Sequence, residues 1–366
     1  MERYCETLPE ETEFEEFRFL SIKLPHIQEN YHMKKPLIII TGPTAVGKTA
    51  LSVRLAERIG GEIISADSMQ VYRHMDIGSA KVTKEEMRGV PHHLIDILEP
   101  SEEFNVVTFQ KRAKEALEEI DSRGSVPIIA GGTGFYIQAL LYDIDFTETE
   151  EDGTFREEME ALAREKGPAV LHAMLKQADP ESAAAIHENN IKRVIRALEF
   201  HRQTGEKISA HNEEERGKES PYQFFYYVVN TDRNLLYERI DRRVDQMMEN
   251  GLVEEVKSLK AMGLTKQMVS MQGLGYKEIL DYLDGNCSLE EAVYILKRDT
   301  RHFAKRQLTW FKRERGVRWL NLPDFDNDRE RVLEHIISEY RLETGRDNTQ
   351  NACYENNAAN STEDMQ

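Results

Sequence analysis

The sequence feature that most constrains the fold is a glycine-rich loop between an apolar run and a helical segment. Residues 37–41 read LIIIT, and residues 42–49 read GPTAVGKT, which fits the pattern G-x-x-x-x-G-K-[ST]. In such a loop the backbone N–H groups point inward, while a lysine and a helix N-terminus add positive charge. The motif predicts that the chain holds a di- or triphosphate, with the Thr49 hydroxyl on Mg²⁺. A chance match in a surface loop is the alternative.

Strand-like and helix-like segments alternate on both sides of this loop. Helices are expected over 48–59, over 106–123 and after the GGTG segment 131–134. Strands are expected in these ranges: 37–41, 62–66, 93–97, 126–130, 223–230 and 317–320. The alternation predicts an α/β fold of the P-loop NTPase type, a parallel sheet flanked by helices.

The pattern changes between residues 146 and 220, where no strand is evident. Helices are expected there over 154–166, 168–177 and 180–203, followed by a charged closing segment, 212–219. We therefore divide the chain into five parts. They are an acidic, poorly ordered leader (1–33), a first core part (34–145), a mostly helical insertion domain (146–221), a second core part with basic C-terminal helices (222–342) and a disordered polar tail (343–366).

Composition limits the class of protein. The 366 residues are 40% hydrophobic, enough for a full core, and no apolar run approaches the length of a membrane span. The acidic N-terminus does not resemble a secretory signal. Cys5, Cys287 and Cys353 are far apart and lack metal-ligand spacing. We expect a cytoplasmic protein without disulfides or a cysteine metal site, and we expect a monomer.

The net charge of −18 argues against a nucleic-acid partner, but its distribution weakens that argument. The leader carries −5 and the tail −4, whereas residues 297–318 carry nine basic and two acidic side chains. This stripe, which includes Lys305 and Arg306, can contact a phosphate backbone because the local field governs contact. A solvated helix face is the alternative. Lys192, Arg193 and Arg196 form a second basic patch that could reach RNA phosphates.

A carboxylate is expected at the same edge of the sheet as the glycine-rich loop. The strand 62–66 is followed by Asp67, whereas the strand 126–130 ends in Ala130 and offers no carboxylate for a nucleoside triphosphate site. Asp67 could accept a proton from a nucleophile, or it could simply cap a turn. Arg239, Arg242 and Arg243 follow the strand 223–230 and could neutralise a diphosphate or form a surface ion-pair face. The adjacent pair His92-His93 is not expected to bind a metal, because neighbouring side chains point in different directions.

Seven segments together resemble the bacterial tRNA dimethylallyltransferases (the tRNA isopentenyltransferase family). They are GPTAVGKT (42–49), SADSMQVYRHMDIGS (65–79), VPHHLIDILEP (90–100), IAGGTGFY (129–136), KRVIRALE (192–199), GLGY (273–276) and RHFAKRQLTWF (301–311). The resemblance spans roughly residues 35–320. One departure is Val46, where loops of the family more often carry a small polar residue, and its side chain is expected to point away from the phosphates.

The resemblance implies a substrate, a reaction and a set of site residues. It implies transfer of a dimethylallyl group from dimethylallyl diphosphate to N6 of the adenosine just 3′ of the tRNA anticodon (position 37), with Mg²⁺ and with Asp67 as the base. Lys48, Thr49 and Arg243 would act on the leaving group. The implied diphosphate site comprises Gly42, Pro43, Thr44, Ala45, Val46, Gly47, Lys48, Thr49 and Arg243. The implied tRNA site comprises Asp67, Ser68, Met69, Gln70, Thr133, Lys192, Arg193, Arg196, Gln272, Gly273, Lys305 and Arg306.

Two other functions fit a glycine-rich phosphate loop. One is a small-molecule kinase in which residues 146–220 form a lid, although the missing strand-end aspartate and the basic patches count against it. The other is a non-catalytic RNA-binding module, and the presence of Asp67 beside the loop counts against that.

Overall fold

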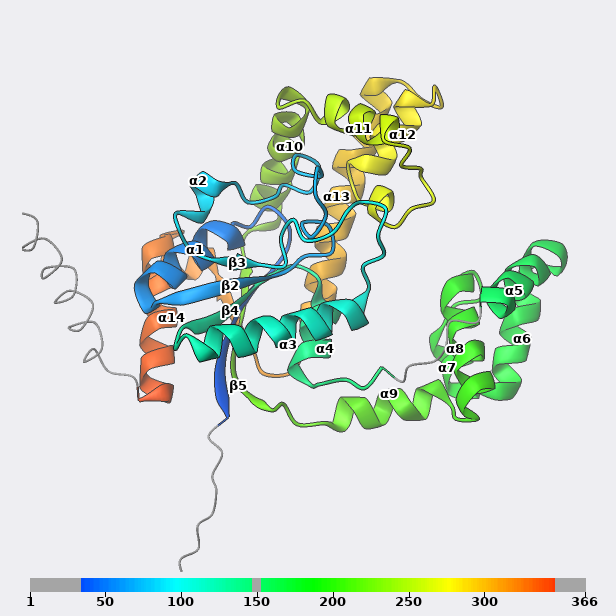
Figure 1. Ribbon diagram of the computed structural model, residues 1–366, viewed down its shortest axis with the longest axis horizontal. Coiled ribbons are helices and arrows are strands. Elements are labelled where there is room, and N and C mark those ends of the chain that lie inside the picture. The colour runs from blue at the N-terminus through cyan, green and yellow to red at the C-terminus, as the bar shows by residue number, and fades with distance from the viewer. Residues whose placement is uncertain (1–33, 147–152, 346–366) are drawn as a thin grey trace, which may run out of the picture. The chain divides into compact units, whose positions relative to one another are not determined.

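A six-stranded parallel sheet lies at the centre of the computed structural model, which describes residues 34–146 and 153–345 (Figure 1). The strands lie in the order β3-β2-β4-β1-β5-β6, and β1 pairs with β4 on one side and β5 on the other. The strands are β1 (Lys35–Thr41), β2 (Gly61–Ala66), β3 (His92–His93), β4 (Val126–Gly131), β5 (Tyr222–Asn230) and β6 (Val317–Asn321). The predicted parallel α/β sheet is confirmed.

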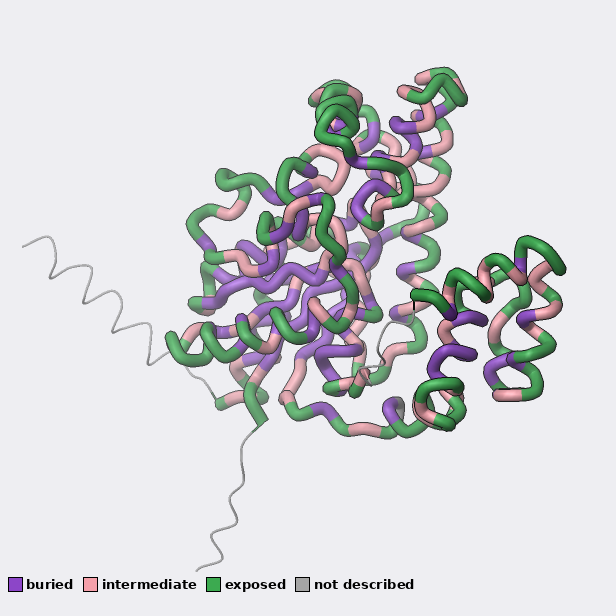
Figure 2. The backbone as a smooth tube through the Cα atoms, turned by 45° about the vertical axis from the view of Figure 1, so that its right-hand side comes forward, coloured by how far each residue is buried: buried purple, intermediate pink, exposed green. Residues whose placement is uncertain are grey.

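The central strands are apolar because both of their faces are covered. Along β1, Leu37 and Ile39 belong to one buried cluster, while Ile38 and Ile40 belong to the cluster on the opposite face. All four side chains are fully buried, and the strands form the most continuously buried part of the tube in Figure 2. Such runs of buried β-branched and leucine residues are typical of parallel sheets with helices on both faces.

Helices cover the two faces of the sheet. The first cluster includes residues of α3 (Val106–Ser122) and α4 (Gly134–Leu141), and the second includes residues of α1 (Lys48–Ile59) and α14 (Arg329–Thr344). The other elements of the core are α2 (Lys84–Met87), α10 (Arg233–Glu249), α11 (Leu252–Ala261), α12 (Tyr276–Leu283), α13 (Leu289–Phe311) and two short 3₁₀ turns at Ser270–Gln272 and Leu322–Phe325. Local caps begin several of these helices, as where the Ser288 hydroxyl accepts from the Glu291 N–H at the start of α13.

The insertion has its own apolar core. Its helices are α5 (Gly153–Lys166), α6 (Pro168–Ala178), α7 (Pro180–Ala185), α8 (Ile191–Thr204) and α9 (Ile208–Gly217). Leu171, Leu175 and Val194 are almost completely buried in a cluster contributed by these helices. The described part of residues 146–221 contains no strand, as the sequence predicts.

Two predicted elements are wrong in detail. The strand expected over 93–97 is only two residues long, because Leu94 and Asp96 adopt positive φ angles of 64° and 55° that end an extended strand. The single helix expected over 180–203 is two helices, separated at residues 186–190, where His187-Glu188-Asn189-Asn190 forms a turn. Asparagine favours such turns because its side chain competes for backbone hydrogen bonds. The segment expected to close the insertion, 212–219, mostly belongs to α9.

The C-terminal boundary also moves. The sequence predicts a polar tail from residue 343, whereas α14 runs to Thr344 and packs on α1 through the apolar cluster. The expected leader (1–33) lies outside the described residues, and so does the tail from residue 346 onward. Among the described helices, none has the length and apolar character needed to cross a bilayer.

Candidate active site

The glycine-rich loop joins β1 to α1 in the conformation that its glycines allow. Gly42, Ala45 and Gly47 have φ angles of 141°, 64° and 100°. A Cβ atom on Gly42 would lie 2.2 Å from the carbonyl oxygen of Val229, so only glycine fits there. The Val46 side chain is 1% exposed and packs in the apolar cluster behind the loop. The expectation that Val46 points away from the phosphate side is therefore confirmed.

Lys48 and Thr49 begin α1 directly after the loop. The Lys48 ammonium donates hydrogen bonds to the carbonyl oxygens of Gly42 (3.0 Å) and Pro43 (2.9 Å), which fold it back over the loop. Burial and the neighbouring Arg243 guanidinium lower the pKa of Lys48 to about 7, against the opposing effect of Asp67. In the absence of a bound anion, the charged form of Lys48 is therefore less stable than that of a lysine in water.

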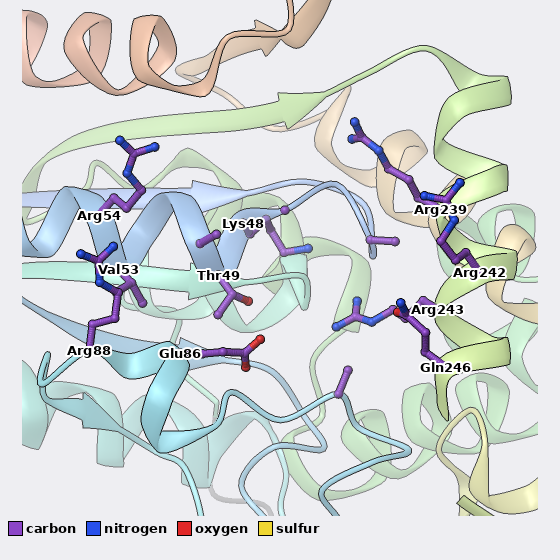
Figure 3. A pocket seen from close by; sticks show the side chains of 14 residues that line it. Lys48, Thr49, Val53, Arg54, Glu86, Arg88, Arg239, Arg242, Arg243 and Gln246 are labelled. Carbon is purple, nitrogen blue, oxygen red and sulfur yellow. The ribbon is translucent and has the colours of Figure 1, made fainter. Parts of the chain in front are cut away.

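Three arginines of α10 face these residues across a cavity of about 540 Å³ (Figure 3). Arg239, Arg242 and Arg243 line it together with Lys48 and Thr49. Arg243 also donates from Nη1 to the Thr44 hydroxyl (3.4 Å), and burial lowers the pKa of its guanidinium. Glu86 of α2 provides the only carboxylate among the residues lining this cavity. A cavity with such an excess of positive charge is suited to a polyanion.

A smaller adjoining cavity, of about 90 Å³, brings the predicted catalytic residues together. It is lined by Asp67, Lys48, Thr49 and Arg243, four residues contributed by three separate parts of the chain. Asp67 follows β2, and its Oδ1 accepts from the backbone N–H groups of Met69 (2.9 Å) and Gln70 (3.4 Å). Its Oδ2 makes no hydrogen bond to any residue that the structure describes. Asp67 therefore caps its turn, as one alternative held, and still presents a second oxygen to the cavity.

Some of the residues predicted to bind the accepting adenosine line this cavity, whereas others lie near it or are exposed. Gln70 lines it, and Met69 lies so close to Gly273 that a Cβ atom on Gly273 would be 2.6 Å from the Met69 methyl group. Thr133 follows β4, where its N–H donates to the Ala66 carbonyl oxygen (3.1 Å). Gln272 is exposed. The structure thus gathers segments from β2, β4 and the turn before α12 at one sheet edge. Ser68, half-buried, lies in the same turn as Asp67.

The two basic patches line neither cavity. Lys192 and Arg193 are exposed on α8, whereas the Arg196 guanidinium donates to the buried carboxylate of Glu199 (3.1 Å). Lys305 and Arg306 are exposed on α13, the helix that also carries two residues of the smaller cavity, Phe303 and Gln307.

Gln307 is a residue of the smaller cavity that the sequence did not single out. Its side-chain oxygen accepts from the Thr44 N–H (2.9 Å), and its amide nitrogen donates to the Gly132 carbonyl oxygen (2.9 Å). It therefore links the phosphate loop to the GGTG segment. Its place inside the segment 301–311 is the only signal in the sequence, and nothing in that segment distinguishes Gln307 from a surface glutamine.

Arg329, at the start of α14, was also missed. Its guanidinium donates to the carbonyl oxygens of Val46 (3.3 Å) and Gly47 (3.5 Å), whereas Lys48 holds the carbonyl oxygens at the start of the loop. Burial, with Arg239 and Arg54 nearby, lowers the pKa of Arg329. The residue fixes the loop backbone and adds a further positive charge beside it.

The described residues offer oxygen atoms for a magnesium ion and no preformed cluster of metal-ligating side chains. Thr49 lines both cavities, with Asp67 in one and Glu86 in the other. Hydroxyl and carboxylate oxygens, completed by phosphate oxygens, are the donors that Mg²⁺ prefers. Of the two adjacent histidines, His92 contacts the Val90 carbonyl oxygen (2.8 Å) and His93 contacts the Glu62 carboxylate (2.9 Å).

Comparison with known proteins assigns the family. Residues 70–314 match the family model described as IPP transferase. The chain belongs to the IPP transferase family. It is therefore a prenyl-transferring enzyme, and the match includes Gln70, Arg243, Gly273 and Gln307. Arg329 and the phosphate loop lie outside the matched range.

Individual relatives match over most of their length. A tRNA dimethylallyltransferase of Lachnoclostridium phytofermentans is 64% identical over 302 residues, which cover 82% of this chain and 96% of the relative. One of Carboxydothermus hydrogenoformans is 53% identical over 312 residues, covering 84% and 98%.

Solved structures agree with this assignment to the IPP transferases. A tRNA isopentenylpyrophosphate transferase of Bacillus halodurans is 46% identical, with a TM-score of 0.64, covering 85% of this chain and 98% of that one. A eukaryotic dimethylallyltransferase acting on tRNA is 30% identical, with a TM-score of 0.72, covering 86% and 80%. The kinase and the non-catalytic module find no support in these matches.

Proposed function

We propose that this IPP transferase moves a dimethylallyl group from dimethylallyl diphosphate to N6 of the adenosine 3′-adjacent to the tRNA anticodon. Diphosphate is released, and N6-dimethylallyladenosine is the product. The observation that carries the proposal is the shared cavity, in which the Asp67 carboxylate stands beside Lys48, Thr49 and Arg243. The family assignment and the names of the relatives support the same reaction.

The leaving group is the first requirement of this reaction. As the allylic carbon–oxygen bond breaks, negative charge grows on the diphosphate oxygen, and the N–H groups of the loop, Lys48 and Arg243 stabilise it. Thr49, with the diphosphate itself, would hold Mg²⁺, which supplies further charge stabilisation when bound. No carboxylate at the end of β4 is needed, because no γ-phosphoryl group is transferred.

The nucleophile is the second requirement. N6 of adenine forms the new bond to the allylic carbon and loses a proton, which the Asp67 Oδ2 accepts. A base stacked in an anticodon loop must leave the stack to reach a cavity of this kind, and proteins commonly read single-stranded loops in that way. The basic patches on α8 and α13 would then contact the phosphates of the stem-loop.

We also propose that the enzyme works as a monomer in the cytoplasm, with Mg²⁺. The location of tRNA substrates and the widely spaced cysteines support the compartment. Sedimentation of the purified protein, with and without tRNA, tests the monomer. Loss of transfer after chelation and its recovery on adding Mg²⁺ test the metal.

A single assay tests the reaction. The protein is incubated with unmodified tRNA, dimethylallyl diphosphate and Mg²⁺, and the nucleosides are analysed by mass spectrometry. We expect one adenosine per responsive tRNA to gain the mass of a dimethylallyl group in place of a hydrogen. Consumption of a nucleoside triphosphate with no change in the tRNA would instead favour a kinase, and binding with no chemistry would favour an RNA-binding module.

A further inference from the structure

A carboxylate outside the active site holds the backbone of a segment that leads into it. Glu255, on α11, accepts hydrogen bonds from three consecutive N–H groups. Its Oε2 accepts from Asp76 (3.0 Å) and Ile77 (2.7 Å), and its Oε1 accepts from Gly78 (3.0 Å). Hydrogen bonds to an ionised acceptor are stronger than neutral ones, and successive N–H groups form a natural seat for an anion. No basic side chain in the described ranges forms an ion pair with Glu255.

Tyr276, at the start of α12, completes this arrangement. Its hydroxyl donates to the Glu255 Oε1 (3.0 Å) and accepts from the Ser79 N–H (3.1 Å). Its ring is fully buried and lies against Gly78, where an added Cβ atom would be 2.6 Å from the ring. Glu255 and Tyr276 together therefore fix four consecutive residues, Asp76 to Ser79.

The segment that they fix borders both cavities of the active site. Ser79 lines the smaller cavity, and the next residue, Ala80, lines the larger one. The Ala80 carbonyl oxygen accepts from the side-chain amide of Gln70 (3.3 Å), and Gln70 lines the smaller cavity with Asp67. The position of Gln70 is thus set from two sides, by the Asp67 turn and by residues 76–80.

The same segment is tied on its other flank. The Lys81 ammonium, whose side chain is 5% exposed, lies 2.6 Å from an Asp76 carboxylate oxygen and 2.5 Å from one of Asp96, and it donates to the Tyr72 carbonyl oxygen (2.6 Å). Contacts from α11, α12 and Lys81 therefore converge on a short irregular stretch, which has no strand or helix of its own to hold it. Irregular backbone needs such partners to keep one conformation.

We propose that Glu255 and Tyr276 are positioning residues for the tRNA-accepting side of the site. They hold residues 76–79 so that Ser79 and Gln70 stand at fixed places opposite Asp67, where the adenine enters. The inference rests on the proposed function and extends it to two residues that line neither cavity. It also explains what the tyrosine of the GLGY segment does, since Gly273 contacts Met69 while Tyr276 contacts residues 78 and 79.

Glu255→Gln is the first test, because it keeps the shape of the side chain. Its amide has only one accepting oxygen, so at least one of the three backbone N–H groups loses its partner. Tyr276→Phe removes both hydrogen bonds of the hydroxyl and keeps the ring against Gly78. Glu254→Gln is the matched control, a neighbouring exposed glutamate on the same helix.

Three measurements are made on each variant of the full chain. They are kcat and KM for tRNA, the Kd of dimethylallyl diphosphate without tRNA, and amide hydrogen exchange over residues 76–80. For Glu255→Gln and Tyr276→Phe we expect kcat/KM for tRNA to fall by about tenfold or more, with diphosphate-substrate affinity within about twofold of the parent. Exchange over 76–80 should accelerate. The double variant should lose less than the product of the two single losses, since both residues act on one segment. Glu254→Gln should match the parent in all three.

The outcomes separate this inference from the proposed function. Exchange over 76–80 that stays as slow as in the parent would overturn the inference whatever the reaction is. So would an unchanged kcat/KM for tRNA, or a loss of substrate affinity as large as the loss of kcat/KM, which would indicate general damage to the fold. A parent protein that modifies no tRNA would overturn the proposed function itself, and with it the tRNA-positioning role. The exchange result would still show whether Glu255 and Tyr276 hold residues 76–79.

Discussion

Within the described chain, two arginines of the helical insertion are paired with a carboxylate of the protein, whereas the three α10 arginines beside the phosphate loop are not. In the insertion, the fully buried Glu199 carboxylate accepts two hydrogen bonds from Arg156 (2.8 and 3.0 Å) and one from Arg196 (3.1 Å). Beside the loop, no carboxylate of the described residues lies within 4.0 Å of the guanidinium groups of Arg239, Arg242 and Arg243. The positive charges of the two arginines in the insertion are therefore balanced by a carboxylate of the protein, whereas the α10 arginines have no such carboxylate beside them in the described ranges.

This difference indicates that the two arginines of the insertion stabilise the fold, whereas those beside the loop are available to bind an anionic ligand. In the insertion the buried Glu199 carboxylate is paired with two arginines, and replacing either arginine by a carboxylate would place a like charge against it. Burial and the neighbouring Arg243 guanidinium lower the pKa of Lys48, so both desolvation and repulsion disfavour its charged form. Asp67 offsets part of this effect, and a bound diphosphate would bring further negative charge.

The largest effect is expected at Asp67. Asp67→Ala should lower kcat by about 10² to 10⁴-fold, because it removes the proton acceptor and leaves the phosphate side intact. Affinity for dimethylallyl diphosphate should stay near that of the parent. Single-turnover kinetics and direct binding measure the two quantities, and a variant with more than about half the parent rate would end the assignment of Asp67 as the base.

Removing the unpaired charges should act on the other substrate. We expect Lys48→Ala and Arg243→Ala to weaken dimethylallyl diphosphate binding by roughly ten- to a hundredfold, since each loses a charge-assisted contact, while tRNA affinity is largely retained. Competition binding with each substrate separates these effects. If tRNA affinity fell and diphosphate-substrate affinity did not, the two-sided site would be wrong.

Matched substitutions on α8 sharpen the comparison between the two kinds of arginine. Arg193→Glu should weaken tRNA binding and reduce its salt dependence, with the melting temperature unchanged, because Arg193 is exposed. Arg196→Glu should in addition destabilise the protein by about 1.5–3 kcal/mol, since it removes a charge-assisted hydrogen bond and places a second carboxylate against the buried Glu199. Filter binding across a salt series and thermal unfolding give both readouts. Equal melting temperatures for the two variants would contradict the structural role of Arg196.

The smallest effect is expected at Arg329. Arg329→Ala should raise the Kd of dimethylallyl diphosphate about three- to tenfold, because the two contacts to the loop are long and act through the backbone. Arg331→Ala is the control, since Arg331 lies on the same helix, is exposed, and pairs with Asp326 and Asp328. A Kd that rises equally in both variants would assign the effect to α14 as a whole.

The sequence predicts local structure far better than contacts between distant segments. The phosphate loop, the alternating elements and the placement of Asp67 and Lys48 at one sheet edge follow from short-range patterns and from the rules of parallel sheets. Arg243 was singled out from its neighbours only by the family resemblance. Gln307 and Arg329 were missed, because their contacts join the loop to residues more than 260 positions away, and no periodicity encodes such a meeting. The strand expected over 93–97 was predicted too long, because Leu94 and Asp96 take positive φ angles without being glycine.

The proton balance of substrate binding tests the central claim, that the cation cluster is completed by a diphosphate. At about pH 8 the Lys48 amine, with its pKa lowered to about 7, is mostly neutral in the free enzyme, and a bound diphosphate should return it to the charged form. Calorimetric titration of dimethylallyl diphosphate in buffers of different ionisation enthalpy should therefore show proton uptake near pH 8. Affinity should fall as the pH rises above about 7, and Lys48→Met should abolish the uptake. Binding without proton uptake by the parent, at an affinity independent of pH between about 7 and 9, would contradict the account.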